Sequence, residues 1–320
     1  MMGGLVQRSA IPLSIGEFDL KISSAVLLSI VSFCAAHAGA ATSIPPAVVS
    51  DPASDPAHPP HSAQVLVPSH GSGMNGLFYL AGGVGPHATL VLLHGLPGNE
   101  QNLDLAQAIR RAGWNVLTLH YRGSWGSPGV FSIAHVMEDV DAAMAFVRRP
   151  DIVERFGIDV RRIVLGGHSM GGFAAAAHAR SDAQLAGLFL LDAWNAGATG
   201  DVFAKVRGPA RAALAHKFFD DFGNSLHGAT GLSTEDELVA HRAQWNFMNW
   251  AKALTKCPLL VIGASKAEGE DNRQLAEAVT RDGGRVTAVT MTTDHGFQDQ
   301  RIALAAAVVT WLQALAANPA

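Results

Sequence analysis

Ser169 stands in a glycine turn at residues 167–171, which read Gly-His-Ser-Met-Gly. The apolar run 163–165 before it predicts a buried strand, and the alanine-rich stretch after Phe173 predicts a helix. In a sharp turn from strand to helix, glycines let the two elements approach closely, and the side chain between them projects clear of the sheet. The G-x-S-x-G pattern occurs once in the chain, and in this context it predicts that Ser169 is a nucleophile.

A serine hydroxyl needs a general base, and the base needs a carboxylate that orients it. His295 follows the last predicted strand, 285–291, and lies in a glycine turn that reads Asp-His-Gly-Phe. It is the histidine that comes after the nucleophile at the end of a strand. We therefore expect His295 to be the base.

The carboxylate has more than one candidate. In the chain order serine, acid, histidine, the acid should follow the strand 259–262, and the loop after this strand holds Glu268, Glu270 and Asp271. We rank Glu268 first, because Asp271 is also a good helix N-cap. Asp192, which ends the preceding strand, ranks second. Asp294 neighbours the base but would have to fold back on it.

An oxyanion hole needs two amide donors at the point where charge develops. The N–H of Met170, directly after the nucleophile, is predicted to be one of them. The second is expected in the glycine-rich turn 94–100, which follows a buried strand. Since Pro97 has no N–H, the donor there should be Leu96. His94 is expected to support this loop.

From residue 74 onward, apolar runs of strand length alternate with helix-like patterns. The predicted strands are 77–80, 89–93, 115–120, 162–165, 188–191, 259–262 and 285–291. The predicted helices are 102–112, 136–149, 170–180, 273–281 and 300–316. Runs that are apolar throughout indicate strands buried on both faces, so the expected fold class is α/β, with a mostly parallel sheet and helices on both faces.

Residues 197–254 interrupt this alternation with helix-like patterns at 202–219 and 235–253. They predict a helical cap over the carboxyl edge of the sheet. Its aromatic side chains, Trp245, Phe247 and Trp250, would either shape an acyl or aryl pocket or belong to the core.

The N-terminus has the pattern of an export signal. Residues 22–36 form an uncharged, mostly apolar run that is too short to span a bilayer. Ala38-Gly39-Ala40 fits a signal cleavage site, and Ala36-His37-Ala38 is a second option. We expect residues 1–40 to be a signal peptide and the mature protein to be periplasmic or secreted, without stable membrane insertion. The proline-rich residues 41–73 are expected to be an extended leader or linker, followed by one domain over 74–320.

The composition excludes several classes of protein. Of the 320 residues, 48% are hydrophobic and 16% are charged, which suits a globular core and excludes a disordered or coiled-coil chain. A net charge of −4 gives no electrostatic reason to expect a nucleic-acid partner, and 2 cysteines exclude a disulfide scaffold. No metal-ligand spacing is present, so no metal or other cofactor is expected. Oligomeric state is not readable from the sequence.

Four motifs together resemble the α/β-hydrolase superfamily over about residues 74–316: His94-Gly95, the segment 121–124, the turn 167–172 and the run 294–297. The loop 121–129 and the run 294–297 look like the branch of dienelactone-hydrolase-like and prolyl-oligopeptidase-like enzymes. The resemblance implies a mainly parallel sheet and a serine acyl-transfer mechanism. Relatives commonly carry an Asp where this chain has Lys266 or Ala267. Either the acid has moved to Glu268 or Asp192, or the triad is impaired.

We therefore expect a serine hydrolase that cleaves a carboxylic ester through an acyl-enzyme. A small exopeptidase or amidase is the alternative, with the cap carboxylates at 220–221 and 235–237 binding a substrate amine. A non-catalytic binding protein on the same fold is the second alternative. Dehalogenases and epoxide hydrolases are disfavoured, because they use an Asp nucleophile where Ser169 stands.

Overall fold

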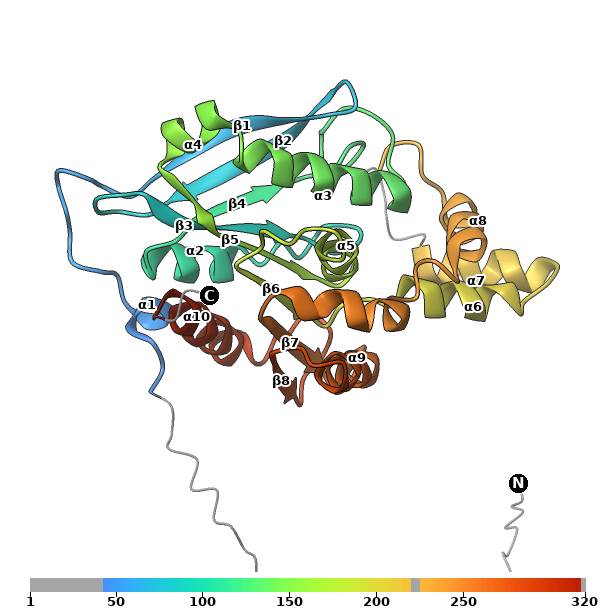
Figure 1. Ribbon diagram of the computed structural model, residues 1–320. Helices are drawn as coiled ribbons and strands as arrows, with labels where there is room; N and C mark the ends of the chain where they lie inside the picture. Colours follow the sequence, from blue (N-terminus) through green and yellow to red (C-terminus); the bar gives the residue numbers. More distant parts are fainter. Residues whose placement is uncertain (1–42, 220–224, 318–320) are drawn as a thin grey trace, which may run out of the picture. The chain divides into compact units, whose positions relative to one another are not determined.

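The computed structural model describes residues 43–219 and 225–317 (Figure 1). In this part of the chain eight strands form one sheet, in the order β1-β2-β4-β3-β5-β6-β7-β8. The strands are β1 (His61–Ser69), β2 (Ser72–Leu80), β3 (His87–Leu93), β4 (Asn115–Leu119), β5 (Ile158–His168), β6 (Gly187–Leu191), β7 (Leu259–Ala264) and β8 (Val286–Met291). From β4 to β8 all neighbours pair in parallel, whereas β1 pairs antiparallel with β2 and β2 with β4. The predicted α/β class with a mostly parallel sheet is confirmed.

Helices cover both faces of this sheet (Figure 1). They are α1 (Pro46–Val49), α2 (Leu103–Arg111), α3 (Ile133–Val147), α4 (Pro150–Phe156), α5 (Met170–Ala179), α6 (Ala196–Ala204), α7 (Pro209–Phe219), α8 (Gly231–His241), the 3-10 helix η2 (Phe247–Lys256), α9 (Gly269–Arg281) and α10 (Arg301–Ala317). On β3, Leu90 and Leu92 join the core under α2 and α10, and Val91 and Leu93 join the core under α3 and α5. Strands that feed both cores explain the continuous apolar runs in the sequence.

The expected leader over 41–73 needs correction. Residues 61–69 form β1, the edge strand, and the short helix α1 lies within 46–49. The proline-rich stretch ends at Pro60, and beyond it Val65 and Val67 alternate with more exposed neighbours, which is the pattern of a strand with one buried face. Pro68 is tolerated because β1 lies at the edge of the sheet. The predicted signal segment 22–36 lies outside the described residues.

The insertion between β6 and β7 contains α6, α7, α8 and η2, and Figure 1 shows α6, α7 and α8 grouped at one end of the sheet. The predicted helix over 235–253 is not continuous, because α8 ends at His241 and Asn246 caps η2 by accepting a hydrogen bond from the Met248 N–H. At Gly200 the close packing of α6 on α8 leaves no room for a side chain, since a Cβ there would lie 2.3 Å from the Leu238 carbonyl oxygen.

A buried ion pair fixes the loop 121–129 to the body of the domain. The fully buried Asp139 of α3 accepts hydrogen bonds from the Arg122 Nε at 2.5 Å, from the Arg122 N–H at 2.8 Å and from the Ser69 hydroxyl at 2.6 Å. Arg122 also pairs with the half-exposed Glu138 at 2.5 Å. The pair thus ties together β1, α3 and a loop that reaches the candidate site.

Asp139→Ala should therefore lower the free energy of unfolding by about 3–5 kcal/mol, since it leaves the buried Arg122 guanidinium without its main partner. Glu138→Ala is the matched control and should cost about 1 kcal/mol or less, because that carboxylate is half-exposed and its ion pair is screened by solvent. Urea denaturation of both variants measures the difference. Equal losses would mean that the Asp139 contact does not hold the loop.

Candidate active site

The turn around Ser169 has the geometry that its glycines predict. Ser169 lies between β5 and α5 with φ +55°, and its N–H donates to the Leu191 carbonyl at 3.0 Å. A Cβ on Gly167 would lie 2.3 Å from the Gly171 backbone, and one on Gly171 would lie 2.5 Å from the Leu93 carbonyl oxygen. Only glycine fits at both positions, so the turn is a tight elbow that leaves the Ser169 side chain partly exposed.

His295 lies beside this elbow. Its ring centroid is 4.6 Å from that of His168, the residue directly before Ser169. Its Nδ1 lies 2.6 Å from the Asp192 carboxylate. An imidazole whose Nδ1–H donates to a carboxylate leaves Nε2 free to accept a proton.

Asp192 is the carboxylate that holds His295, and it is fully buried. Besides His295, it accepts hydrogen bonds from the N–H of Ala264 at 2.8 Å and from the N–H of Glu268 at 3.2 Å. Its backbone has φ +42°, a left-handed conformation that Asp adopts more readily than most residues. These donors fix the carboxylate and satisfy its charge away from water.

The first-ranked acid, Glu268, does not contact the base. Within the described residues its carboxylate makes no hydrogen bond to His295, and only its backbone N–H serves the site, as a donor to Asp192. Burial and, next, the neighbouring Asp192 charge raise the pKa of Glu268. The geometry therefore reverses the order of the two candidates: the loop expected to supply the acid supplies amide donors to it instead.

The other acid candidates have local roles. Glu270 pairs with Arg273 at 2.6 Å, and the Asp294 carboxylate accepts the Gln298 N–H at 3.0 Å within its own turn. Asp271 lies in the first turn of α9, where Glu268 and not Asp271 takes the N-cap position. None of the three is hydrogen-bonded to His295 in the described part of the chain.

The loop expected to hold the second amide donor lies against the nucleophile. A Cβ on Gly95 would lie 2.9 Å from the Ser169 Cβ. Within the described residues the Leu96 N–H makes no hydrogen bond. Met170 begins α5, and the first N–H groups of a helix have no partner within it. Both predicted amides thus belong to elements that meet at Ser169.

Aromatic side chains hold this loop in place. The His94 Nδ1 lies 2.7 Å from the Gly95 carbonyl oxygen, and the Tyr121 hydroxyl donates to the His94 carbonyl at 3.0 Å. The Trp125 Nε1–H donates to the Pro97 carbonyl at 2.7 Å. The loop 121–129, anchored by Asp139, therefore supports the segment that carries Leu96.

His168 contributes to the site although the sequence reasoning assigned it no role. Its Nε2 donates to the His295 carbonyl at 2.8 Å, which fixes the turn that carries the base. Burial and, next, the proximity of His295 lower the pKa of His168 to about 4, so it stays neutral beside the base. The only sequence signal of this contact is that His168 directly precedes Ser169.

The cap aromatics do not line a pocket at the serine. Trp245, Phe247 and Trp250 are buried in the main core, and the Trp245 and Trp250 rings pack on Phe173 at 5.9 and 5.4 Å. Of the two alternatives that the sequence left open, the structure favours the core.

A serine on a tight elbow, a histidine on a buried carboxylate and two backbone amides are the kinds of group that acyl transfer requires. Among the described residues, no cluster of His, Cys, Asp or Glu side chains is arranged to hold a metal ion. In the same residues no helix is both long enough and apolar enough to cross a membrane.

Comparisons with known proteins agree with this fold. A family model described as "Alpha/beta hydrolase family" matches residues 90–307. A search of curated proteins finds no match. Among solved structures, the chain resembles a hyperthermophilic esterase from the archaeon Pyrobaculum calidifontis at 18% identity, covering 81% of this chain and 88% of that one with a TM-score of 0.58.

Two further structures are similar. A fungal esterase from Rhizomucor miehei is 17% identical, with 81% of this chain and 84% of that one covered and a TM-score of 0.59. A thermostable carboxylesterase cloned from a metagenomic library is 18% identical, with 83% of this chain and 92% of that one covered and a TM-score of 0.57. At such identities the likeness shows a shared fold.

Proposed function

The chain belongs to the alpha/beta hydrolase family, and from that premise we propose that it is a serine hydrolase that cleaves carboxylic esters. The observation that carries this proposal is the contact of 2.6 Å between His295 and the buried Asp192, next to the elbow that presents Ser169. A carboxylate that accepts a hydrogen bond from Nδ1 holds the imidazole with Nε2 available to the serine. It also stabilises the imidazolium that forms during the reaction.

The proposed reaction proceeds in two halves. The Ser169 Oγ attacks the ester carbonyl carbon while His295 Nε2 takes its proton, and the N–H groups of Leu96 and Met170 stabilise the oxyanion. The C–O bond to the alcohol breaks as His295 returns the proton to the leaving oxygen. Water, activated by His295, then attacks the acyl-enzyme, and the acid is released with Ser169 restored.

Ester cleavage is favoured over the exopeptidase alternative by the state of the cap carboxylates. Glu235 is buried and pairs with Arg211, which also pairs with Asp236. The Glu237 carboxylate accepts the N–H groups at the start of α3, at 2.8 and 2.9 Å. These groups stabilise the fold and are not free to bind a substrate amine, and residues 220–221 lie outside the described part. The structural relatives named above are themselves called esterases.

Initial rates on p-nitrophenyl butyrate and on aminoacyl p-nitroanilides test the proposal. We expect kcat/KM to be at least about 100-fold higher for the ester, a difference of about 2.7 kcal/mol in transition-state free energy. A higher value for an aminoacyl anilide would replace the esterase by the peptidase.

We also propose that the protein is exported, on the pattern of residues 22–36 and the small residues that follow them. The N-terminus of the mature protein, read by mass spectrometry, decides this: a start after Ala38 or Ala40 supports export, and an intact Met1 contradicts it.

A further inference from the structure

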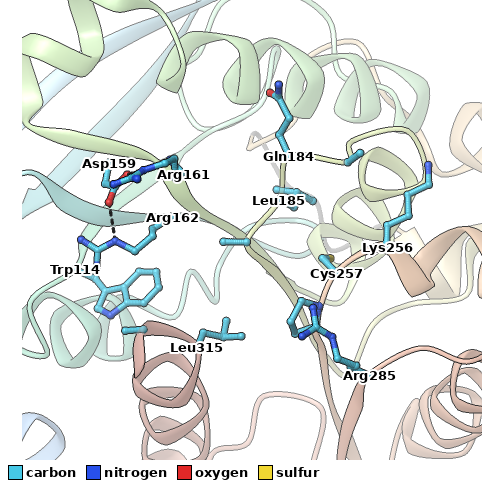
Figure 2. Close-up of a pocket in the computed structure, with 14 residues that line it drawn as sticks. Trp114, Asp159, Arg161, Arg162, Gln184, Leu185, Lys256, Cys257, Arg285 and Leu315 are labelled. Carbon is cyan, nitrogen blue, oxygen red and sulfur yellow. Dashed lines mark hydrogen bonds and ion pairs between the residues drawn. The ribbon is translucent and has the colours of Figure 1, made fainter. Parts of the chain in front are cut away.

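A cavity of about 640 Å³ lies near the amino ends of the parallel strands (Figure 2). Its lining comes from the segments around the starts of β5, β6, β7 and β8, whereas Ser169, Asp192 and the loop after Ala264 follow the ends of β5, β6 and β7. We call it the amino-edge cavity and define it by Trp114, Arg162, Leu185, Lys256, Arg285 and Leu315. It shares no lining residue with the site at Ser169.

One wall of the amino-edge cavity is apolar. Trp114 and Leu185 are almost fully buried, and Leu315 of α10 is partly exposed beside them. At the start of β6, Gly187 allows α10 to come close, because a Cβ there would lie 2.8 Å from the Leu315 Cδ1. An indole and branched aliphatic groups in a cavity of this size suit a flat or branched apolar body.

The rim of the amino-edge cavity is positively charged on two sides. Arg161, Arg162, Lys256 and Arg285 line it, against one carboxylate, Asp159. Figure 2 shows Arg161 and Arg162 beside Asp159, and Lys256 and Arg285 across the opening from them. Arg162 neutralises Asp159 at 2.7 Å, which leaves an excess of positive charge in the cavity.

Among the cations that line this cavity, Arg285 is the one without a partner in the described part of the chain. Within the described residues its guanidinium makes no hydrogen bond and no ion pair, whereas Lys256 donates to the Arg180 carbonyl oxygen. Cys257 adds no negative charge beside it, because burial raises the pKa of this thiol to about 11. A planar guanidinium with free donors is the group that proteins use to bind a carboxylate, sulfonate or phosphate.

We propose that the amino-edge cavity is a second ligand site, which takes a small organic anion with an aromatic or branched apolar body. The anionic group pairs with Arg285, and the apolar body lies against Trp114, Leu185 and Leu315. The volume falls within the usual range for small-molecule sites of about 300–1,000 Å³. The proposal does not depend on the reaction at Ser169.

Calorimetric titration of the full chain with naphthalene-2-sulfonate tests it, with the neutral naphthalene-2-methanol and inorganic sulfate as comparison probes. We expect saturable binding of the sulfonate and affinities at least about tenfold weaker for the neutral analogue and for sulfate, since a charge-assisted hydrogen bond and the apolar contacts each contribute. The titration is repeated after Ser169 has been blocked by a fluorophosphonate, and the affinity should not change.

Arg285→Gln should weaken sulfonate binding about tenfold, whereas Lys252→Gln, which removes an exposed cation outside the cavity, should leave it unchanged. Both positions are on the surface, and circular dichroism checks that both variants are folded. No saturable binding, an unchanged affinity in Arg285→Gln, an equal affinity for the neutral analogue or for sulfate, or loss of binding on blocking Ser169 would each overturn the proposal. Ester hydrolysis is measured in a separate assay. A protein that fails to hydrolyse the ester can therefore still be tested for sulfonate binding.

Discussion

Replacing Ser169 with alanine is expected to lower kcat toward p-nitrophenyl butyrate by about a millionfold, as removal of a triad nucleophile does elsewhere. The variant keeps the oxyanion donors and the base but has no oxygen that can form an acyl-enzyme, so residual turnover must come from water. Alanine keeps the Cβ that serine already places in the elbow and only removes the hydroxyl, so it adds no atom to the packing there. We therefore expect the thermal unfolding temperature to stay close to that of the wild type.

Ser181→Ala is the control, since Ser181 is an exposed serine outside the site whose hydroxyl donates to the His178 carbonyl. It should retain full activity. A Ser169→Ala variant that hydrolyses the ester within about tenfold of the wild-type rate would show that the chemistry lies elsewhere.

Asp192→Asn is expected to lower kcat by about ten-thousandfold, the loss seen when the orienting carboxylate of a triad becomes an amide. An asparagine retains the shape of the side chain but cannot both accept the Ala264 and Glu268 N–H groups and accept from His295 as a carboxylate does. Its amide group would stabilise the wrong tautomer of His295 and would not balance the imidazolium charge.

Glu268→Gln is the matched control for this prediction. Its carboxylate does not touch His295, and its backbone N–H donor to Asp192 is retained in the variant. We expect kcat to change by less than about tenfold. The reverse pattern, with an active Asp192→Asn and an inactive Glu268→Gln, would restore Glu268 as the acid.

Most of the parallel strands could be predicted from the sequence, because strands buried on both faces are apolar throughout. The runs at β3, β6 and β7 had this property, and the structure places each of them inside the sheet. The edge strand β1 was missed because prolines precede it and one of its faces is exposed. The helix α4 was missed because its seven residues after Arg149 carry little periodic pattern.

The elbow was readable for a steric reason. No side chain fits at Gly167 or Gly171 in this turn, so a tight turn of this kind requires glycine at both positions and the sequence shows it. The residues around the acid do not show which carboxylate reaches His295, because this depends on how the ends of β6 and β7 pack together. The Asp192 N–H donates to the Ile262 carbonyl at 2.7 Å, and this register between β6 and β7 brings Asp192 under the loop that contains Glu268.

A sequence signal for the acid was nevertheless present. Asp192 is the first polar residue after the buried run 187–191, so it had to lie at the carboxyl edge of the sheet. The amino-edge cavity left no such signal, because Trp114, Leu185, Arg285 and Leu315 belong to four segments far apart in the chain.

Fluorophosphonate labelling of the purified protein, followed by peptide mass spectrometry, tests the activated serine most directly. An activated nucleophile reacts with this probe, whereas a serine that only caps a helix does not. We expect one adduct, on the peptide that contains Ser169, and no adduct in the Ser169→Ala variant. A folded wild-type protein that stays unlabelled, or that is labelled at another serine, would contradict the proposed reaction and favour a binding protein on the same fold.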